Sequence, residues 1–467
     1  MSLTCFKSYD IRGRLGPELN ESVAALIGRA FGQALDARRV VLGRDCRASS
    51  ASLATAVAVG LREAGVDVLD LGLCGTEEVY FATAHLGADG GIEVTASHNP
   101  MDYNGMKLVK AGAAPLEPAL LARVRALAEG GRFTPAQPGQ AQPGLAQPGQ
   151  IIAVDTRPAY VQRILSFVDI AALRPLKILV NAGNGTAGPT FDALAAELAR
   201  RGAPLSFQRI HHDPDGRFPH GIPNPLLPEN QPVTAQAVRA HNADFAVAWD
   251  GDFDRCFLFD NEGSFVPGEY VVGLLAEAFL AKEPGATIIH DPRIIWNTQD
   301  LVARAGGQAV MAPTGHVFLK ARMREIGAVY GGEMSAHHYF RDFMACDSGM
   351  IPWLLVAELL SRSGQSLRDV LAARRAEFPS SGEVNFRVAD VKAAVAAVEA
   401  AYAPQAQGRN DLDGLSLDLG DWRFSLRASN TEPLLRLNVE ARGRPGLVQS
   451  RVAEISALIG EAAKGPD

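Results

Sequence analysis

The stretch that decides the fold is Arg39–Gly75, RVVLGRDCRASSASLATAVAVGLREAGVDVLDLGLCG. An apolar run at Val40–Leu42 leads into a polar turn, an Ala-rich segment follows, and a second apolar run begins at Val66. Short runs rich in Val and Leu, bounded by turn residues, are typical of buried strands, and the longer Ala-rich segment between them favours a helix. A strand, a turn and a helix in this order predict a largely parallel α/β sheet.

The same unit recurs at Leu176–Gly202 and at Ala286–Gly307, which predicts three related α/β domains. The 467 residues are too many for one core and suggest two to four domains of about 100–200 residues each. Leu415–Ser429 and Pro433–Gly443 alternate apolar and polar residues, so we expect an antiparallel sheet with one covered face in a smaller C-terminal α+β domain. The expected domains are 1–150, 151–257, 258–372 and 373–467.

Thr134–Gln150 repeats a Gln-Pro-Gly unit and is interpreted as a surface loop or domain edge. The composition is that of a globular protein, with 47% hydrophobic and 21% charged residues. The net charge of −7 argues against a nucleic-acid or anionic-membrane partner. Five scattered cysteines, no signal-peptide pattern and no apolar run of about 18 residues favour a reducing cytoplasm.

An acidic cluster follows the apolar run before Asp250. Asp250, Asp252 and Asp254 stand at alternate positions, and such carboxylates repel one another unless a cation neutralises them. Oxygen ligands alone favour Mg²⁺ or Mn²⁺ over zinc. An EF-hand is excluded, because Arg255 and Asn261 occupy its glycine and glutamate positions. A solvated acidic turn is the alternative.

Three further motifs carry polar groups that suit a phosphate or a sugar. Ser97 and His98 lie in TASHNP, where a simple turn with a helix-capping serine is the alternative. Glu333, Ser335 and His337 alternate in GGEMSAHHYF and could bind sugar hydroxyls or form a polar loop. The segment RASNTEP holds the parts of a phosphate cradle, or of a capping turn, in Arg427, Ser429, Asn430 and Thr431.

These motifs, in this order, resemble the α-D-phosphohexomutase family over nearly the whole chain. The motifs that carry the resemblance are YDIRG, GRDCR, TASHNPMDYNGMK, GNGTAG, GIPNPLLPEN, DGDFDR, GEMSAHHYFRDF and RASNTEP. The resemblance implies four domains around a central cleft. It also implies an isomerase that interconverts hexose 1- and 6-phosphates through a phosphoserine and a hexose 1,6-bisphosphate, with mannose phosphates favoured over glucose phosphates.

The resemblance assigns roles to individual residues. Ser97 would carry the phosphoryl group, and Asp250, Asp252 and Asp254 would hold Mg²⁺ together with a phosphoserine oxygen. Lys107 matches a proton-transfer residue, with His98 as an alternative, and Arg255 would add positive potential. The sugar phosphate would contact Tyr9, Arg12, Arg293, Glu333, Ser335, His337, Arg427, Ser429, Asn430 and Thr431. Arg293 stands where related enzymes often have lysine, which leaves its exact contact open.

Lys107 could act as a base only if its pKa fell well below about 10.4, and we expect nearby cations to lower it. We expect a monomer. A predominant phosphoglucomutase, a metal-dependent sugar phosphatase and a non-catalytic sugar-phosphate-binding protein are the alternative functions.

Overall fold

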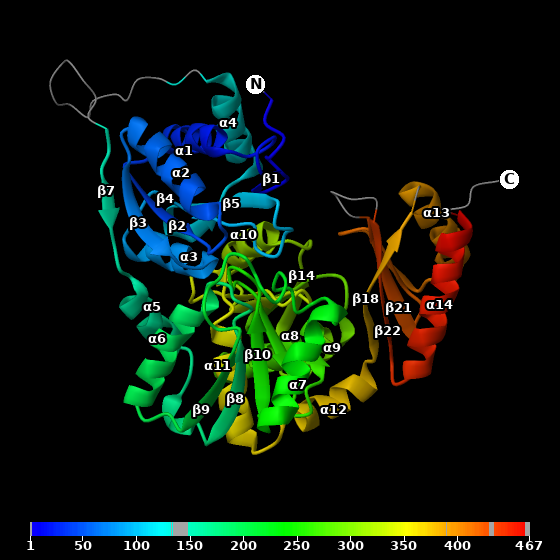
Figure 1. Cartoon of the computed structure of the whole chain (residues 1–467). Coiled ribbons are helices and arrows are strands. Elements are labelled where there is room, and N and C mark those ends of the chain that lie inside the picture. The colour runs from blue at the N-terminus through cyan, green and yellow to red at the C-terminus, as the bar shows by residue number, and fades with distance from the viewer. Residues whose placement is uncertain (1, 132, 134–147, 389, 429–433, 463–467) are drawn as a thin grey trace. The chain divides into compact units, whose positions relative to one another are not determined.

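The computed structural model describes residues 2–131, 133, 148–388, 390–428 and 434–462 (Figure 1). The chain forms two compact units, residues 1–265 with 337–364, and residues 266–336 with 365–467. The chain therefore leaves the first unit, returns to it and leaves it again.

The N-terminal part of the first unit is built on a mixed sheet in the order β1-β5-β4-β2-β3-β7, with β6 paired to β5. Its strands are β1 (Ile11–Arg14), β2 (Arg39–Arg44), β3 (Asp67–Leu73), β4 (Gly90–Val94), β5 (Tyr103–Lys110), β6 (Ala114–Pro115) and β7 (Ile151–Ala153). Its helices are α1 (Glu21–Leu35), α2 (Ser50–Glu63), α3 (Thr76–His85) and α4 (Pro118–Gly130). Strands β2, β3, β4 and β7 are parallel, whereas β5 is antiparallel to both β4 and β1.

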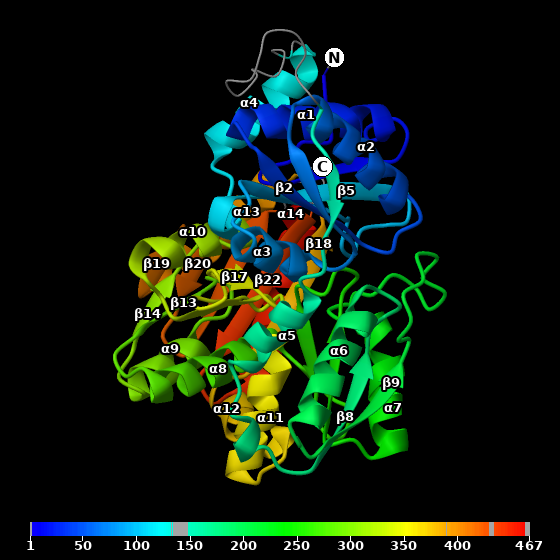
Figure 2. The ribbon, with the colours of Figure 1, turned by 90° about the vertical axis from the view of Figure 1, so that its left-hand side faces the viewer.

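Helices cover both faces of this sheet, because successive residues of a strand point to opposite sides. Val40 and Leu42 of β2 lie in a core with residues of α1, α2 and α4. Val41, between them, packs with Val79 and Ala82 of α3 instead. Figure 2 shows α3 and the pair α1 and α2 around these strands. The continuous apolar runs of the sequence are thus explained by burial on two sides.

A second sheet in the first unit has the order β12-β11-β10-β8-β9. Its strands are β8 (Leu176–Asn181), β9 (Leu205–Ile210), β10 (Phe245–Trp249), β11 (Cys256–Phe259) and β12 (Phe265–Val266), and its helices are α5 (Arg157–Leu165), α6 (Ala187–Arg200) and α7 (Gln231–His241). Residues 337–364 add β16 (His338–Phe340), β17 (Cys346–Asp347) and α11 (Ile351–Ser363). The expected domain limit at 257/258 lies inside β11.

The second unit begins with a part in which helices alternate with parallel strands and ends with an antiparallel sheet. The first part contains α8 (Gly268–Lys282), β13 (Thr287–His290), α9 (Trp296–Arg304), β14 (Gln308–Met311), α10 (His316–Ile326), β15 (Tyr330–Gly332) and α12 (Leu367–Glu377), with β14, β13 and β15 parallel. The C-terminal part contains β18 (Ser380–Arg387), α13 (Val391–Tyr402), β19 (Gly408–Asn410), β20 (Leu415–Asp418), β21 (Trp422–Ala428), β22 (Leu434–Ala441) and α14 (Pro445–Ala462).

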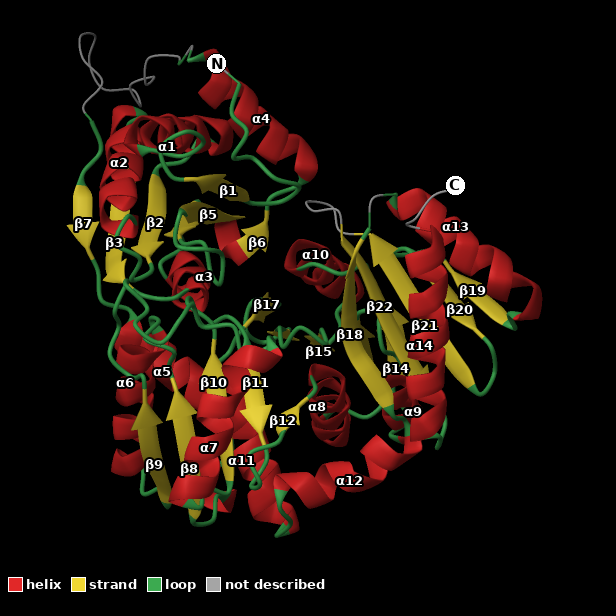
Figure 3. Ribbon diagram, turned by 45° about the vertical axis from the view of Figure 1, so that its right-hand side comes forward, coloured by secondary structure: helices red, strands yellow, loops and turns green. Residues whose placement is uncertain are grey.

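The C-terminal strands run in the order β18-β22-β21-β20-β19, and all neighbouring strands are antiparallel. Figure 3 shows α13 and α14 along one face of this sheet. Phe424, Leu426, Leu437 and Val439 pack beneath them with Ile455 of α14. The expected sheet with one covered face is therefore present.

The fold class predicted from the sequence is confirmed, with mixed α/β sheets followed by a smaller α+β domain. No disulfide links the five cysteines, all of which lie in the described residues. Within the described ranges, no helix combines the length and apolarity that crossing a bilayer requires. Residues 134–147 of the Gln-Pro-Gly repeat lie outside the described residues.

Candidate active site

The loop between β4 and β5 brings Ser97 against the acidic cluster. Ser97 is buried, and its hydroxyl donates a hydrogen bond of 2.7 Å to Asp250 Oδ2. His98 Nδ1 lies 3.0 Å from the same hydroxyl. The backbone φ of Ser97 is +49°, a left-handed conformation that non-glycine residues adopt at a cost, most often at functional sites. Sequence reasoning therefore named a serine and an aspartate that the fold places in contact.

The three aspartates lie in the turn that joins β10 to β11. Trp249 and Cys256 pair across the two antiparallel strands, so residues 250–255 form the whole connection between them. All three carboxylates are at most 2% exposed and have oxygens within 4.8 Å of one another. The Oδ1 atoms of Asp250, Asp252 and Asp254 have no hydrogen-bond donor among the described residues.

Three buried carboxylate oxygens without donors require a partner, because buried acceptors are nearly always satisfied. Their convergence in one turn fits a hard divalent cation with oxygen ligands. The arrangement of the aspartates can thus hold a metal ion, as the sequence predicted.

Lys107 on β5 reaches the same cluster from the neighbouring strand. Its ammonium donates a 2.7 Å hydrogen bond to Asp252 Oδ2 and a second, shorter one to Asp254. Burial lowers the pKa of Lys107, but Asp252, Asp254 and Asp250 raise it more, so the pKa lies above its ordinary value. The nearest charges to Lys107 in the structure are thus carboxylates and not the expected arginines, and a lowering of this pKa by bound Mg²⁺ stays a prediction.

The pKa values of Asp250 and Asp254 are shifted in opposite directions. Burial and the charge of Asp254 raise the pKa of Asp250, although Arg255 and Lys107 oppose them. Burial also raises the pKa of Asp254, but Lys107 and then His337 outweigh it, and this pKa lies well below the ordinary range. Burial and then the charge of Arg255 hold the pKa of His98 well below its usual value, so the imidazole beside Ser97 is neutral.

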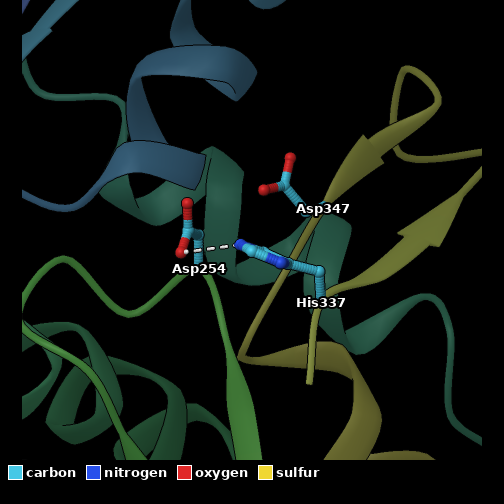
Figure 4. A group of neighbouring side chains, drawn as sticks. All are labelled: Asp254, His337 and Asp347. Atoms are coloured by element: carbon cyan, nitrogen blue, oxygen red, sulfur yellow. Dashed lines mark ion pairs between the residues drawn. The ribbon is translucent and has the colours of Figure 1, made fainter. Parts of the chain in front are cut away.

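Arg255 and His337 flank the cluster. The Arg255 guanidinium lies 3.5 Å from Asp250 Oδ2 and donates a 3.2 Å hydrogen bond to His337 Nε2. Figure 4 shows the His337 ring directed at Asp254, with Asp347 nearby, and its Nε2 is 3.6 Å from Asp254 Oδ1. Arg255 Nε and Asp254 Oδ1 thus both lie close to the same nitrogen of His337.

Arg12 lies in β1, and Tyr9 lies just before this strand. Arg12 pairs with Asp10 at 2.8 Å and donates a 2.5 Å hydrogen bond to Asn99 Oδ1, two residues after Ser97. Tyr9 is half-buried in the preceding turn. The structure therefore brings Arg12 to the Ser97 loop.

A second group of predicted residues lies in the second unit. Arg293 is buried, donates to Asp291 Oδ2 at 2.6 Å and to Ser335 Oγ at 3.3 Å, and lies 3.7 Å from Glu333. Glu383 lies 3.7 Å from Arg293. Burial, together with the charge of Arg293, lowers the pKa of Arg427. Ser429, Asn430 and Thr431 lie outside the described residues.

Sequence reasoning missed three residues around the Ser97 loop. Thr76 donates to Asp252 Oδ2 at 2.7 Å, and Thr95 accepts the Ser97 N–H at 2.9 Å. The Arg47 guanidinium donates to the carbonyl oxygen of Ser97. The GRDCR motif was the available signal for Arg47, but its partners lie about fifty residues further along the chain.

Four family models match the chain in order. They describe the alpha/beta/alpha domains I, II and III and the C-terminal domain of phosphoglucomutase/phosphomannomutase, at residues 4–134, 158–263, 267–378 and 383–458. The chain belongs to the phosphoglucomutase/phosphomannomutase family. It is an isomerase of the phosphohexomutase type.

Individual members of this family match over the full length. A phosphomannomutase of Salmonella montevideo is 58% identical, with 98% of this chain and 99% of the relative covered. A protein of Xanthomonas campestris named phosphohexose mutases is 54% identical, covering 98% of this chain and all of the relative. The crystal structure of a phosphoglucomutase/phosphomannomutase family protein from Burkholderia thailandensis has a TM-score of 0.85 at 33% identity, covering 99% of this chain and 98% of that one.

Proposed function

We propose that this phosphohexomutase interconverts mannose 1-phosphate and mannose 6-phosphate through a phosphoserine at position 97 and a hexose 1,6-bisphosphate. The observation that supports this best is the buried Ser97 hydroxyl, 2.7 Å from Asp250 and beside three carboxylate oxygens that lack donors. The name of the Salmonella relative favours mannose. The broader name of the Xanthomonas relative makes glucose phosphates a further candidate substrate.

Mg²⁺ is the proposed cofactor, held by Asp250, Asp252 and Asp254 together with an oxygen of the phosphorylated Ser97. When bound, it would neutralise charge on the phosphoryl group during transfer. The all-oxygen set of ligands supports this choice of ion over zinc.

The residues of this chain divide the work of the reaction. Ser97 gives up and regains the phosphoryl group, and the Arg255 guanidinium adds positive potential beside it. His98 is neutral and 3.0 Å from the serine oxygen, so it is suited to hold the proton of that oxygen. Lys107, hydrogen-bonded to Asp252 and Asp254 beside Ser97, is the proposed proton-transfer residue for the sugar hydroxyl.

The groups in the second unit are proposed to bind the sugar phosphate. Arg293 and Arg427 offer guanidinium groups to a phosphate, and Glu333 and Ser335 offer acceptors and a donor to hydroxyls. His337, Tyr9 and Arg12 stay proposed substrate contacts in the first unit, and Ser429, Asn430 and Thr431 stay proposed from the sequence alone. A monomer is the proposed oligomeric state. A reducing cytoplasm is the proposed location, because no disulfide links the five cysteines, all of which the structure describes.

The decisive experiment compares kcat/KM for mannose 1-phosphate and glucose 1-phosphate while inorganic phosphate is followed in parallel. We expect 6-phosphate products, a preference for mannose and almost no free phosphate. Phosphate released in step with turnover would identify a phosphatase instead, and binding without turnover would identify a non-catalytic protein. Mass spectrometry should find phosphate on Ser97 in the purified enzyme, and Ser97→Ala should abolish the interconversion.

A further inference from the structure

Arg47 ends the GRDCR turn after β2, and its side chain is only 2% exposed. Its guanidinium donates hydrogen bonds to four carbonyl oxygens of one loop, the loop that carries Ser97. Nη2 donates to Ser97 O (2.9 Å) and Asn99 O (2.6 Å), and Nη1 donates to Pro100 O (2.9 Å) and Tyr103 O (3.3 Å). The whole turn between β4 and β5 is therefore gathered around one side chain.

Arg47 is itself held in place from two sides. Asp45 accepts the Arg47 backbone N–H at 2.9 Å and the Thr95 hydroxyl at 2.8 Å. Thr95 in turn accepts the N–H of Ser97. The Phe218 ring lies against the guanidinium, with its centroid 5.6 Å from Arg47 Cζ. Asp45 and Arg47 thus support the Ser97 loop at its start and along its length.

Bringing four carbonyl oxygens close together costs free energy, and a guanidinium offsets this cost better than an ammonium group. Four carbonyl dipoles that point to one place repel one another, and Ser97 has a φ of +49°. A guanidinium presents five N–H donors in a rigid plane, whereas a lysine has three donors on one atom. A lysine at position 47 would keep the charge but could not reach four separate acceptors with the same geometry.

We propose that Arg47 is a positioning residue for phosphoryl transfer. By holding the four carbonyls it keeps Ser97 in its left-handed conformation, with the side chain facing Asp250, so that the phosphoserine is aligned for a sugar hydroxyl rather than for water. The inference rests on the proposed phosphoserine mechanism and adds a residue that does not touch the reacting atoms.

The two competing reactions differ only in the attacking oxygen. In each, the bond between phosphorus and Ser97 Oγ breaks as a new phosphorus–oxygen bond forms, and the proton of the attacking hydroxyl ends on the serine oxygen. A sugar hydroxyl yields the hexose bisphosphate, and water yields inorganic phosphate. A loop that holds Ser97 loosely should therefore favour water, because alignment with the sugar is lost while water is abundant.

The test uses full-length Arg47→Met and Arg47→Lys, with Arg62→Met as the matched control. Arg62 lies on α2 in the same part of the chain and also donates to a backbone carbonyl, that of Gly149, at 2.7 Å. Each protein is phosphorylated on Ser97 with glucose 1,6-bisphosphate and then given mannose 1-phosphate. The measured quantities are kcat, KM, the melting temperature and the fraction of phosphoserine lost as inorganic phosphate.

For Arg47→Met we expect kcat to fall about 100-fold with little change in KM, since a small misplacement near the reacting groups has this effect. The fraction lost to water should rise, and guanidinium chloride should restore kcat where the same concentration of NaCl does not. In kcat and in the fraction lost to water, Arg47→Lys should lie between the wild type and Arg47→Met. Arg62→Met should match the wild type.

The proposal would be overturned if Arg47→Met had the kcat of the wild type and lost the same fraction of its phosphoserine as inorganic phosphate. It would also be overturned by a lower melting temperature and kcat with an unchanged fraction lost and no rescue, because that pattern indicates a purely structural role. If the wild type itself fails to interconvert hexose phosphates, the proposed function is lost. The positioning claim is then decided by a crystal structure of Arg47→Met, which should show Ser97 outside the left-handed region and its contact with Asp250 broken.

Discussion

Lys107 lies among three carboxylates, and its charge holds two of them together. The side chain is 7% exposed, so water does not replace it as a partner of Asp252 and Asp254. Removing one member of a buried ion pair leaves the other charge uncompensated, which costs about 3–5 kcal/mol.

We therefore expect Lys107→Met to lower the melting temperature in the absence of divalent cations, and MgCl₂ to raise it more than in the wild type. The physical reason is that a cation would take over the charge of the two freed aspartates. Lys110→Met is the control, because Lys110 stands three residues later on the same strand in a partly exposed pair with Glu117. Equal Mg²⁺ shifts in wild type and Lys107→Met would show that the ion does not take over the charge of Lys107.

His290 makes a pH-dependent contribution to stability in the second unit. It is 2% exposed, and burial lowers its pKa below the usual value of 6.5. Its Nδ1–H donates to Asp291 O at 2.7 Å, so Nε2 is left to accept from the Gln299 amide at 3.3 Å, which fixes the neutral form.

A lowered folded-state pKa means that the unfolded chain takes up the proton first as the pH falls. The contribution of His290 to the free energy of unfolding should thus be fully present above about pH 6.5. It should decline below that pH by at most about 1.4 kcal/mol per pH unit. His290→Gln should flatten the melting temperature between pH 5 and 6.5 relative to the wild type. An unchanged slope would mean that folding does not lower the pKa of His290.

Among the elements, the turn between β10 and β11 must fit closely against the Ser97 loop. A Cβ on Gly251 would lie 2.7 Å from Ser97 O, a backbone atom that cannot move without moving the serine. Gly251→Ala should therefore fold but lose about 100-fold in kcat, as expected for a displacement of about 1 Å. Gly130→Ala, at the end of α4 with nothing within 4 Å, is the control and should keep full activity. Wild-type kcat in Gly251→Ala would show that this contact is not needed for catalysis.

A buried ion pair ties the C-terminal sheet to the start of α9. Glu440 accepts the N–H groups of Ile295 and Trp296 at 2.8 and 3.0 Å. Arg423 donates to Glu440 at 2.5 Å and to Arg293 O at 2.9 Å. The pair thereby fixes the segment that carries Arg293, and β21 runs directly from Arg423 to Arg427.

Glu440→Gln should destabilise the protein by about 3–5 kcal/mol, because Arg423 is left buried without its partner. The double variant Arg423→Met with Glu440→Gln should lose less than the sum of the single losses. Arg444→Met, which breaks an exposed pair with Asp421, should change stability by less than about 1 kcal/mol. Additive losses in the double-mutant cycle would exclude the coupling.

Elements and motifs differ in how far the sequence predicts them. Alternation and apolar runs predicted the sheets, since burial on one or two faces imposes those patterns directly. The contact between Ser97 and the aspartates was predicted from sequence motifs, each of which covers only a few neighbouring residues. The pKa of Lys107 and the role of Arg47 could not be predicted, because both depend on partners from distant strands. The phosphate loop at Ser429–Thr431 and the domain limits stay predictions.

At the scale of the whole molecule, the compact units do not follow the order of the domains along the chain. Residues 337–364 lie within the stretch matched by the family model of domain III, yet they belong to the first compact unit. Trp353 of α11 is fully buried, with its ring 5.8 Å from Phe191 and 6.0 Å from Phe207 between centroids. Trp249 Nε1–H donates to Gly349 O at 2.8 Å.

These contacts predict that residues 1–265 alone cannot form a stable unit. Losing a buried tryptophan side chain costs about 3–5 kcal/mol on its own, and the apolar faces beneath α11 would be exposed to water. We expect this fragment to bind a hydrophobic dye and to melt without a cooperative transition. Joining it to residues 337–364 through a flexible linker of about 20 residues should restore cooperative melting. The control is the same linked protein with Trp353→Ala, which should melt at a lower temperature. A fragment of residues 1–265 that melts cooperatively at the temperature of the linked protein would show that the returning segment contributes nothing to the first unit.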